Sequence, residues 1–201
     1  MTMRVAVAAS GRGSNLEALL RTLGPGAPAR VVLVLSDRAA AGALALARSH
    51  GVATQVLADP ANPDEWLAPL ERAEVGLVVL AGYLKLVPPR VVEHYRGRVV
   101  NIHPALLPAF GGRGMYGRRV HEAVLASGAR ESGASVHLVD EVYDRGEVLA
   151  RARVPVLPGD DPDRLAARVL EAEHRLLPAV VLAAARAGRP VPLPEPVESH
   201  P

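Results

Sequence analysis

The chain has 201 residues, with 23 Lys and Arg against 21 Asp and Glu, 18 Gly, 18 Pro and no Cys. This length predicts one soluble domain, and a chain of this size buries roughly 70% of the surface that its unfolded form exposes, so its core needs no disulfide. The absence of Cys excludes a thiol nucleophile and Cys-ligated zinc or iron–sulfur centres. A formal net charge of +2 without a block of like charge argues against nucleic acid as a partner.

Two features of the sequence bear on where the protein acts. Its longest apolar stretches, Val75–Leu84 and Leu176–Ala185, fall short of the roughly 20 residues that span a bilayer, so we expect no membrane association. The first residues contain only one short apolar run, Val5–Ala9, which is too few residues for the apolar part of a secretory signal. We therefore expect a cytoplasmic protein.

Short apolar runs alternate with helical patterns through the first part of the chain. The predicted elements are, in order, a strand at Val5–Ala9, a helix from Asn15, a strand at Val31–Leu35, a helix at Ala39–His50, a strand at Ala53–Leu57, a helix at Asp64–Ala73 and a strand at Val75–Leu80. Strands that alternate with helices of about ten residues imply right-handed crossovers and a parallel sheet with helices on both faces.

The pattern changes further along the chain. The predicted elements there are a short helix at Pro88–Tyr95, a strand at Arg98–Val100, a helix at Tyr116–Ser127, strands at Ser132–Val139 and Glu147–Val156, and a helix from about Asp160 to Ala187. The last two strands alternate in polarity and are joined by a short acidic loop, which predicts antiparallel pairing. The sequence thus predicts a single α/β domain at 1–187, with a mostly parallel sheet and an antiparallel C-terminal portion, followed by a Pro-rich tail at 188–201.

The first strand-to-helix turn, Ser10–Leu16, is rich in Gly. Gly lets the backbone approach a ligand, and a helix N-terminus offers unpaired N–H groups, so the turn suits a phosphate. A dinucleotide fingerprint needs a third Gly where Leu16 stands, and Asp37 alone is weak support for a ribose-binding acid, which argues against a nicotinamide cofactor. The alternative is a tight turn capped by Ser14 or Asn15 without a ligand.

A polar pair follows the predicted strand that begins near Arg98. Pro104 forces His103 into an extended conformation, so Asn101 and His103 share one face while Ile102 is directed at the core. Ligands of open α/β folds collect at the carboxyl ends of the strands, where this pair lies. An amide beside an imidazole suits catalysis there, although a single His is more often structural.

Other polar residues give weaker signals. Asp144 lies in a turn-like loop after a strand, where a solvated carboxylate is the simpler reading. Ser135 and His137 share a strand face and could line a cleft, and Glu173 reads as a solvated residue of a surface helix. His121-Glu122 lacks the second His of the H-E-x-x-H motif, so no metal site is predicted.

Taken in order, several segments resemble the phosphoribosylglycinamide formyltransferases, folate-dependent enzymes of purine synthesis. The segments that carry the resemblance are Ser10–Leu16, Val79–Lys85, Asn101–Pro108, Gly133–His137 and Asp144–Gly146. The similarity runs roughly from Val5 to Ala187. It implies the formyltransferase fold, whose N-terminal half is Rossmann-like.

The resemblance implies transfer of the formyl group of 10-formyltetrahydrofolate to the glycinamide amine of a ribonucleotide, without a metal. The site residues that it implies are Asn101, His103 and Asp144 for catalysis, Gly13, Ser14 and Asn15 for the ribonucleotide phosphate, Glu173 for the glycinamide ribonucleotide, and Leu84, Lys85, Leu86, Val87 and Asn101 for the folate. Its partners are then small molecules. A homodimer, which occurs in the family, stays open.

The implied catalytic trio suits acyl transfer, in which an amine attacks a carbonyl carbon and an oxyanion develops. Asn101 would donate a hydrogen bond to that charge. The Asp144 carboxylate would raise the pKa of His103 and hold it as imidazolium, ready to stabilise the oxyanion or to protonate the departing folate nitrogen.

The chain departs from the family pattern in three places, one of them near Pro63–Glu65, where an Arg that is usual before the third helix is replaced. Two other readings remain. A Gly-rich segment, Phe110–Gly117, stands where a shorter Pro-Gly-His run is common, and Arg145 stands where a Gly is common. One alternative is a 10-formyltetrahydrofolate hydrolase, which has a similar catalytic core and an extra N-terminal regulatory domain. The other is a non-catalytic module that binds nucleotide phosphates.

Overall fold

A computed structural model of the chain describes residues 2–194. Its strands are β1 (Met3–Ala8), β2 (Ala29–Ser36), β3 (Ala53–Val56), β4 (Leu77–Leu80), β5 (Val99–His103), β6 (Glu131–Leu138) and β7 (Val148–Pro155). Its helices are α1 (Ser14–Thr22), α2 (Gly42–Ser49), α3 (Pro63–Arg72), α4 (Pro89–His94), α5 (Arg118–Ala126) and α6 (Pro162–Ala187). Every element expected from the sequence is therefore present, with ends that differ by a few residues.

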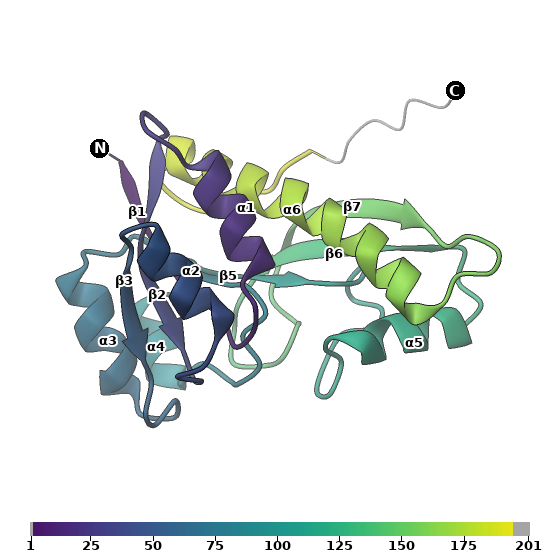
Figure 1. The fold of residues 1–201 in the computed structure, drawn as a ribbon, viewed down its shortest axis with the longest axis horizontal. Coiled ribbons are helices and arrows are strands. Elements are labelled where there is room, and N and C mark those ends of the chain that lie inside the picture. The colour runs from purple at the N-terminus through teal and green to yellow at the C-terminus, as the bar shows by residue number, and fades with distance from the viewer. Residues whose placement is uncertain (1, 195–201) are drawn as a thin grey trace.

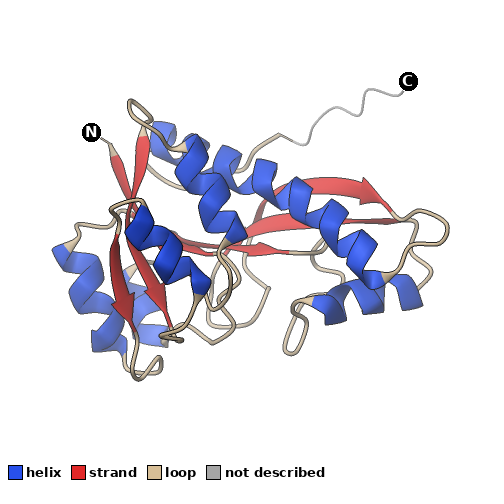
Figure 2. Cartoon of the chain, in the orientation of Figure 1, coloured by secondary structure: helices blue, strands red, loops and turns tan. Residues whose placement is uncertain are grey.

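The seven strands form one mixed sheet in the order β3-β2-β1-β4-β5-β6-β7 (Figure 2). The first five strands in that order are parallel, β6 is antiparallel to β5, and β7 is antiparallel to β6. This confirms the predicted α/β fold with an antiparallel C-terminal portion. All four residues of β4 are buried, as the apolar run Leu77–Leu80 requires in a strand covered on both faces.

Helices cover both faces of the sheet, and each face has its own core (Figure 1). One core contains buried residues of α1, α2, α5 and α6, such as Leu19, Leu44 and Leu177. The other contains residues of α3 and α4, with Trp66 fully buried. Burial of these apolar surfaces is the main force that holds the layers together.

Strand β5 is longer than the sequence predicts. The expected strand ends at Val100, whereas β5 continues to His103 because it pairs with β6 over its whole C-terminal half. In this register Asn101 lies opposite His137 and His103 lies opposite Ser135. The polar pair is therefore fixed by the sheet itself and not by a loop after it.

The sheet reverses its strand order beside β1. From β1 the chain proceeds outward to β2 and β3, then crosses to β4 on the other side of β1. Loops after β1 and β4 diverge at such a point and leave a crevice at the carboxyl ends of the strands, which is where ligands bind in open α/β sheets.

The segment after α6 returns to the sheet. Leu193 donates its backbone N–H to the carbonyl oxygen of Leu149 on β7, at 2.7 Å, and packs against the larger core. The remainder of the predicted Pro-rich tail, residues 195–201, lies outside the described residues.

Candidate active site

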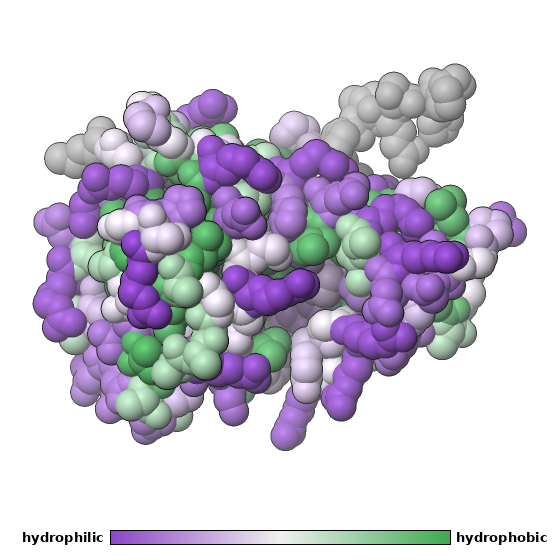
Figure 3. Space-filling model, viewed as in Figure 1, coloured by the Kyte–Doolittle hydropathy of each residue, from purple (hydrophilic) through white to green (hydrophobic). Residues whose placement is uncertain are grey.

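A cavity of about 840 Å³ lies at the carboxyl ends of β1, β4 and β5, in the crevice beside β1. It is lined by Gly11–Asn15, Leu80–Val87, Asn101–Pro104, Gly112–Arg119, His121, His137, Val139, Asp140, Val142–Asp144, Asp163, Ala166, Val169, Leu170 and Glu173. On the face of the molecule seen in Figure 3, hydrophilic residues dominate and apolar residues form only small separate patches. A cavity of this volume, with several polar side chains in its lining, suits a small ligand.

The Gly-rich turn after β1 forms one wall of the cavity. Gly13 has a left-handed φ of 90°, and a Cβ atom there would lie 2.9 Å from the Cα atom of Ala43 on α2, so only Gly fits. Helix α1 begins at Ser14, and its N-cap residue, Gly13, makes no side-chain capping bond. Neither Ser14 nor Asn15 therefore caps the helix, which contradicts that part of the alternative reading. The first residues of α1 line the cavity, and helix N-termini favour anions.

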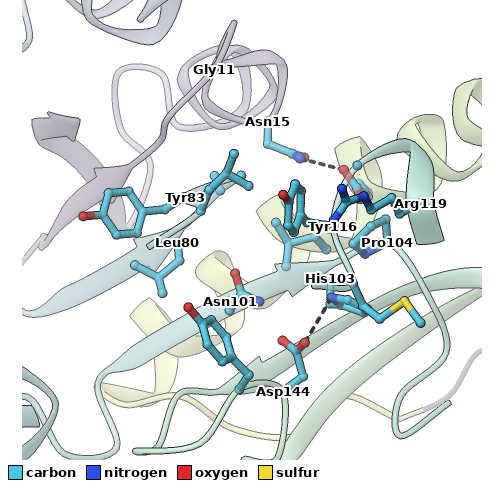
Figure 4. A pocket seen from close by; sticks show the side chains of 18 of the residues that line it. Gly11, Asn15, Leu80, Tyr83, Asn101, His103, Pro104, Tyr116, Arg119 and Asp144 are labelled. Atoms are coloured by element: carbon cyan, nitrogen blue, oxygen red, sulfur yellow. Dashed lines mark hydrogen bonds and ion pairs between the residues drawn. The ribbon is translucent and has the colours of Figure 1, made fainter. Parts of the chain in front are cut away.

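Asn15 and Glu173 meet at the edge of this wall, although 158 residues separate them in the sequence (Figure 4). The Asn15 Nδ2 atom donates to the Glu173 Oε2 atom at 2.7 Å. Glu173 is 7% exposed, so its reading as a solvated surface residue is wrong. Burial raises the pKa of Glu173 to about 7, although the bond from Asn15 opposes that change.

The opposite side of the cavity holds Asn101, His103 and Asp144, which the structure brings together (Figure 4). The His103 Nδ1 atom lies 3.6 Å from an oxygen of Asp144, and the His103 Nε2 atom lies 2.8 Å from the carbonyl oxygen of Phe110. A carbonyl oxygen only accepts, so the Nε2 atom carries the proton and donates it. Ile102 lies in the core between the two polar residues, as the strand alternation predicts.

Asp144 is not the solvated turn residue that its local sequence suggests. Its side chain is 9% exposed, its φ is 55°, and one carboxylate oxygen accepts the backbone N–H of Gly112 at 2.8 Å. Burial acts to raise the pKa of Asp144, but the His137 Nε2 atom 3.4 Å away, the charge of His103 and the hydrogen bond from the Gly112 N–H outweigh it, so the pKa is lowered overall. Asp144 is therefore ionised at neutral pH.

The expected rise in the pKa of His103 is wrong. His103 is 3% exposed, and this burial lowers its pKa more than the Asp144 carboxylate and the Phe110 carbonyl oxygen raise it. His137 adds a further, smaller lowering. His103 is consequently a neutral imidazole near pH 7, with a carboxylate placed to stabilise the proton that it takes up.

His137 completes this side of the site. Its Nδ1 atom donates to the carbonyl oxygen of Leu138 at 2.8 Å, so in the neutral ring its Nε2 atom is free to accept the Nδ2–H of Asn101 at 3.0 Å. That bond orients the Asn101 amide and uses one of its two N–H groups. The sequence placed His137 beside a cleft through strand alternation but did not reveal its contact with Asn101, which arises from the pairing of β5 with β6.

Ser135, which shares that strand face, has a structural role instead. Its hydroxyl donates to the carbonyl oxygen of Ala105 at 2.7 Å and accepts the backbone N–H of Leu107 at 3.0 Å. These bonds hold the segment after His103 in place. His121, which in the sequence is only part of an incomplete metal motif, is 5% exposed and lines the cavity from α5.

The stretch Leu84–Val87 follows β4 and forms a further wall. Leu84 and Leu86 are 37% and 52% exposed, whereas Val87 is buried. Val142 and Tyr143 from the loop after β6 are also exposed, and both line the same cavity. These exposed apolar side chains give part of the cavity an apolar lining, which suits a ring system.

Two further observations concern the described part of the chain, residues 2–194. Its helices include none that is long and apolar enough to cross a membrane. Its His, Asp and Glu side chains form no cluster of three or more that could hold a metal ion.

The fold and site agree with a known class of enzymes. The family model described as formyl transferase matches residues 3–181, and the chain belongs to this family. Within it, the chain is similar to the phosphoribosylglycinamide formyltransferases. It is 44% identical over 186 residues to the chloroplastic one of Arabidopsis thaliana, covering 89% of this chain and 64% of that protein. It is 43% identical over 190 residues to that of Mycobacterium tuberculosis, covering 92% and 86%.

Solved structures agree. The phosphoribosylglycinamide formyltransferase of Brucella melitensis superposes with a TM-score of 0.82 at 44% identity, covering 96% of this chain and 99% of that one. That of Anaplasma phagocytophilum has a TM-score of 0.87 at 34% identity, covering 93% and 88%. The chain spans 64% and 59% of the length of the two plant relatives, from Arabidopsis thaliana and Vigna unguiculata.

Proposed function

We propose that the chain transfers the formyl group of 10-formyltetrahydrofolate to the glycinamide amine of 5-phosphoribosylglycinamide. The products are the N-formyl ribonucleotide and tetrahydrofolate, in the de novo synthesis of IMP. The observation that supports the proposal is that one cavity is lined by Asn101, His103 and Asp144 and by the turn at the start of α1. The names of the relatives support the same reaction.

The two substrates occupy opposite sides of the cavity. Gly13, Ser14 and Asn15 bind the ribonucleotide phosphate through the N–H groups at the start of α1. Glu173, held by Asn15, accepts hydrogen bonds from the glycinamide ribonucleotide. The folate lies along Leu84, Lys85, Leu86 and Val87 and reaches Asn101 with its formyl group.

The reaction then follows from the side chains at the centre. The amine attacks the formyl carbon, a C–N bond forms and negative charge develops on the formyl oxygen. The second N–H of Asn101, which His137 leaves free, stabilises that oxygen, an effect worth on the order of 10²–10³ in rate. The C–N10 bond of the folate then breaks as the tetrahedral intermediate collapses.

His103 moves the proton that this exchange requires. As a neutral imidazole it takes a proton from the attacking amine, and Asp144 stabilises the imidazolium that results. His103 then gives the proton to N10 of the departing folate. The base and the acid are thus one residue, and no net proton is gained or lost by the protein.

We also propose the setting in which the activity occurs. The domain comprises residues 1–187, with 188–201 as a Pro-rich tail, and acts in the cytoplasm on small molecules, without nucleic acid, membrane or metal. A homodimer is compatible with this assignment.

An absorbance assay with 10-formyldideazafolate tests the function directly. With the ribonucleotide present, the protein should release the deformylated folate analogue and give the N-formyl ribonucleotide. A control reaction without the ribonucleotide should release no deformylated folate analogue. Release without an acceptor would assign the chain as a 10-formyltetrahydrofolate hydrolase, and silence in both reactions, with binding of the ribonucleotide, would leave a nucleotide-phosphate binding module.

A further inference from the structure

We propose that Ser10 is a positioning residue for the folate donor. Its hydroxyl group, oriented by Asp37, holds the backbone after β4 in the shape that binds the donor. The inference rests on the proposed function, because Leu84–Val87 form the wall that we assign to the folate. Neither Ser10 nor Asp37 belongs to the residues that we place against a substrate.

The hydroxyl group of Ser10 makes two hydrogen bonds. It donates to the Asp37 Oδ1 atom at 2.6 Å and accepts the backbone N–H of Leu84 at 3.1 Å. The backbone N–H of Ser10 donates to the carbonyl oxygen of Gly82 at 3.0 Å. Since a hydroxyl has a single proton, the bond to Asp37 fixes its direction and turns a lone pair toward Leu84.

These bonds connect three neighbouring strand ends. Ser10 follows β1, Asp37 follows β2, and Gly82–Leu84 follow β4, and β1 lies between the other two strands in the sheet. In Figure 4, Gly11 and Tyr83 mark the two segments that Ser10 links. Ser10 lies beside β1, where the strand order reverses. Its bonds thus set the separation between the Gly-rich turn after β1 and the stretch Leu84–Val87, which we call the folate wall.

Ser10 and Asp37 are both buried, which restricts the positions that their side chains can take. Ser10 is 2% exposed and the side chain of Asp37 is 4% exposed. A buried carboxylate needs partners, and besides Ser10 it has only the half-exposed guanidinium of Arg38 at 4.0 Å within the described residues. Asp37 is thus engaged inside the protein and does not line the cavity.

The stretch Leu84–Val87 needs a contact with another segment to hold its backbone in place. Tyr83 is buried with its ring edge-to-face against Trp66, and Val87 is buried, but Leu84 and Leu86 between them are exposed. Packing therefore fixes the two ends of the stretch and not its centre. The bond from the Leu84 N–H to Ser10 supplies the restraint at that centre.

Three substitutions and a control separate this role from general stability. Ser10→Ala removes both side-chain bonds, Asp37→Ala removes only the orientation of the hydroxyl, and Asp37→Asn keeps an oxygen that accepts from it. Ser132→Ala is the control, because Ser132 is also 2% exposed but lies on β6, away from the cavity. For each variant we would measure amide hydrogen exchange at Leu84, the affinity for 10-formyldideazafolate, and kcat and KM for both substrates.

The Ser10→Ala variant should exchange the Leu84 amide faster and bind the folate analogue about 3- to 10-fold more weakly, the effect expected for one hydrogen bond. Its KM for the folate should rise in parallel, while kcat and the KM for the ribonucleotide stay within about two-fold of the wild type. Asp37→Asn should restore most of the affinity that Asp37→Ala loses. The double variant Ser10→Ala/Asp37→Ala should be no weaker than Ser10→Ala alone, because Asp37 acts through Ser10.

Other results would overturn the inference. Unchanged exchange at Leu84, unchanged affinity for the analogue in Ser10→Ala, or an equal loss in Ser132→Ala each contradicts a positioning role. A wild-type protein that binds the analogue without transferring its formyl group would refute the proposed function, and the exchange and affinity data would still decide the role of Ser10. A wild-type protein that does not bind the analogue would overturn both.

Discussion

His103 is subject to two opposing influences. Its burial lowers the pKa, and the Asp144 carboxylate 3.6 Å from the Nδ1 atom raises it, with burial the larger effect. Because the pKa of the folded state lies below that of the unfolded chain, protonation favours unfolding, and the stability contributed by neutral His103 is lost as the pH falls through the folded-state pKa.

Replacing the Asp144 carboxylate should leave the lowering of the His103 pKa by burial less opposed. In Asp144→Asn the pKa of His103 should fall further below its usual value, because the opposing charge is gone. NMR titration of the imidazole in both proteins measures this change. A pKa that rises or stays constant in Asp144→Asn would show that the carboxylate does not act on His103.

Glu173 makes a prediction about stability. Its pKa of about 7 in the folded protein lies above that of an unfolded Glu, so folding binds a proton between about pH 4.5 and 7, and the stability from this group is lost as the pH rises through that range. Glu173→Gln removes the titration while keeping an oxygen for Asn15. The variant should therefore gain stability over the wild type between pH 5 and pH 8, by up to about 3 kcal/mol. Denaturant unfolding at both pH values measures it, and an equal difference at both would contradict the account.

At the scale of elements, the turn between β1 and α1 combines backbone strain with close packing. Gly13→Ala would place a Cβ atom 2.9 Å from Ala43 at a φ of 90°. This should cost about 1–3 kcal/mol, lower Tm by several degrees and raise the KM for the ribonucleotide. Gly11→Ala is the matched control, because a Cβ there meets nothing within 4 Å, and its Tm should stay within about one degree of the wild type. Equal Tm values for the two variants would refute the strain argument.

The sequence predicts elements well where a local pattern is sufficient. Apolar runs identify the parallel strands, and the constraint of Pro104 on His103 places Asn101 and His103 on one face. Contacts between distant elements leave no such trace. Glu173 reads as solvated in the sequence because its burial and its hydrogen bond from Asn15 both arise from the packing of α1 against α6.

The same dependence on contacts between distant elements explains why the pKa of His103 is lowered, whereas the sequence predicts a rise. A nearby acid can be suggested by a motif, but the depth of burial depends on how β5, β6 and the loop that carries Asp144 pack together. His137 was likewise visible only as one of two polar residues on a strand face. The register of β5 with β6 decides that it holds Asn101.

At the scale of the whole molecule, the site uses almost the full length of the chain. The turn proposed to bind the phosphate follows the first strand, the proposed catalytic residues lie on β5 and after β6, and Glu173 lies on the last helix. The complete cavity therefore forms only when both the sheet and the long helix α6 are assembled.

The end of the domain is testable in the same terms. The boundary at Ala187 stays a prediction, and the contact of Leu193 with β7 is the structural feature that bears on it. A chain that ends at Ala187 should melt a few degrees lower than one that ends at Pro194, because it loses that hydrogen bond and the packing of Leu193. Equal Tm values would place the boundary at Ala187 without a contribution from the segment that follows.

A comparison of the wild type with His103→Ala tests whether His103 and its neighbours carry out formyl transfer. The rate of ribonucleotide-dependent formyl transfer should be measured for the wild type and for His103→Ala, with binding of 10-formyldideazafolate measured in parallel. In His103→Ala we expect kcat to fall by about 10²–10⁴-fold, while the affinity for 10-formyldideazafolate changes little. A variant that turns over at close to the wild-type rate would contradict it.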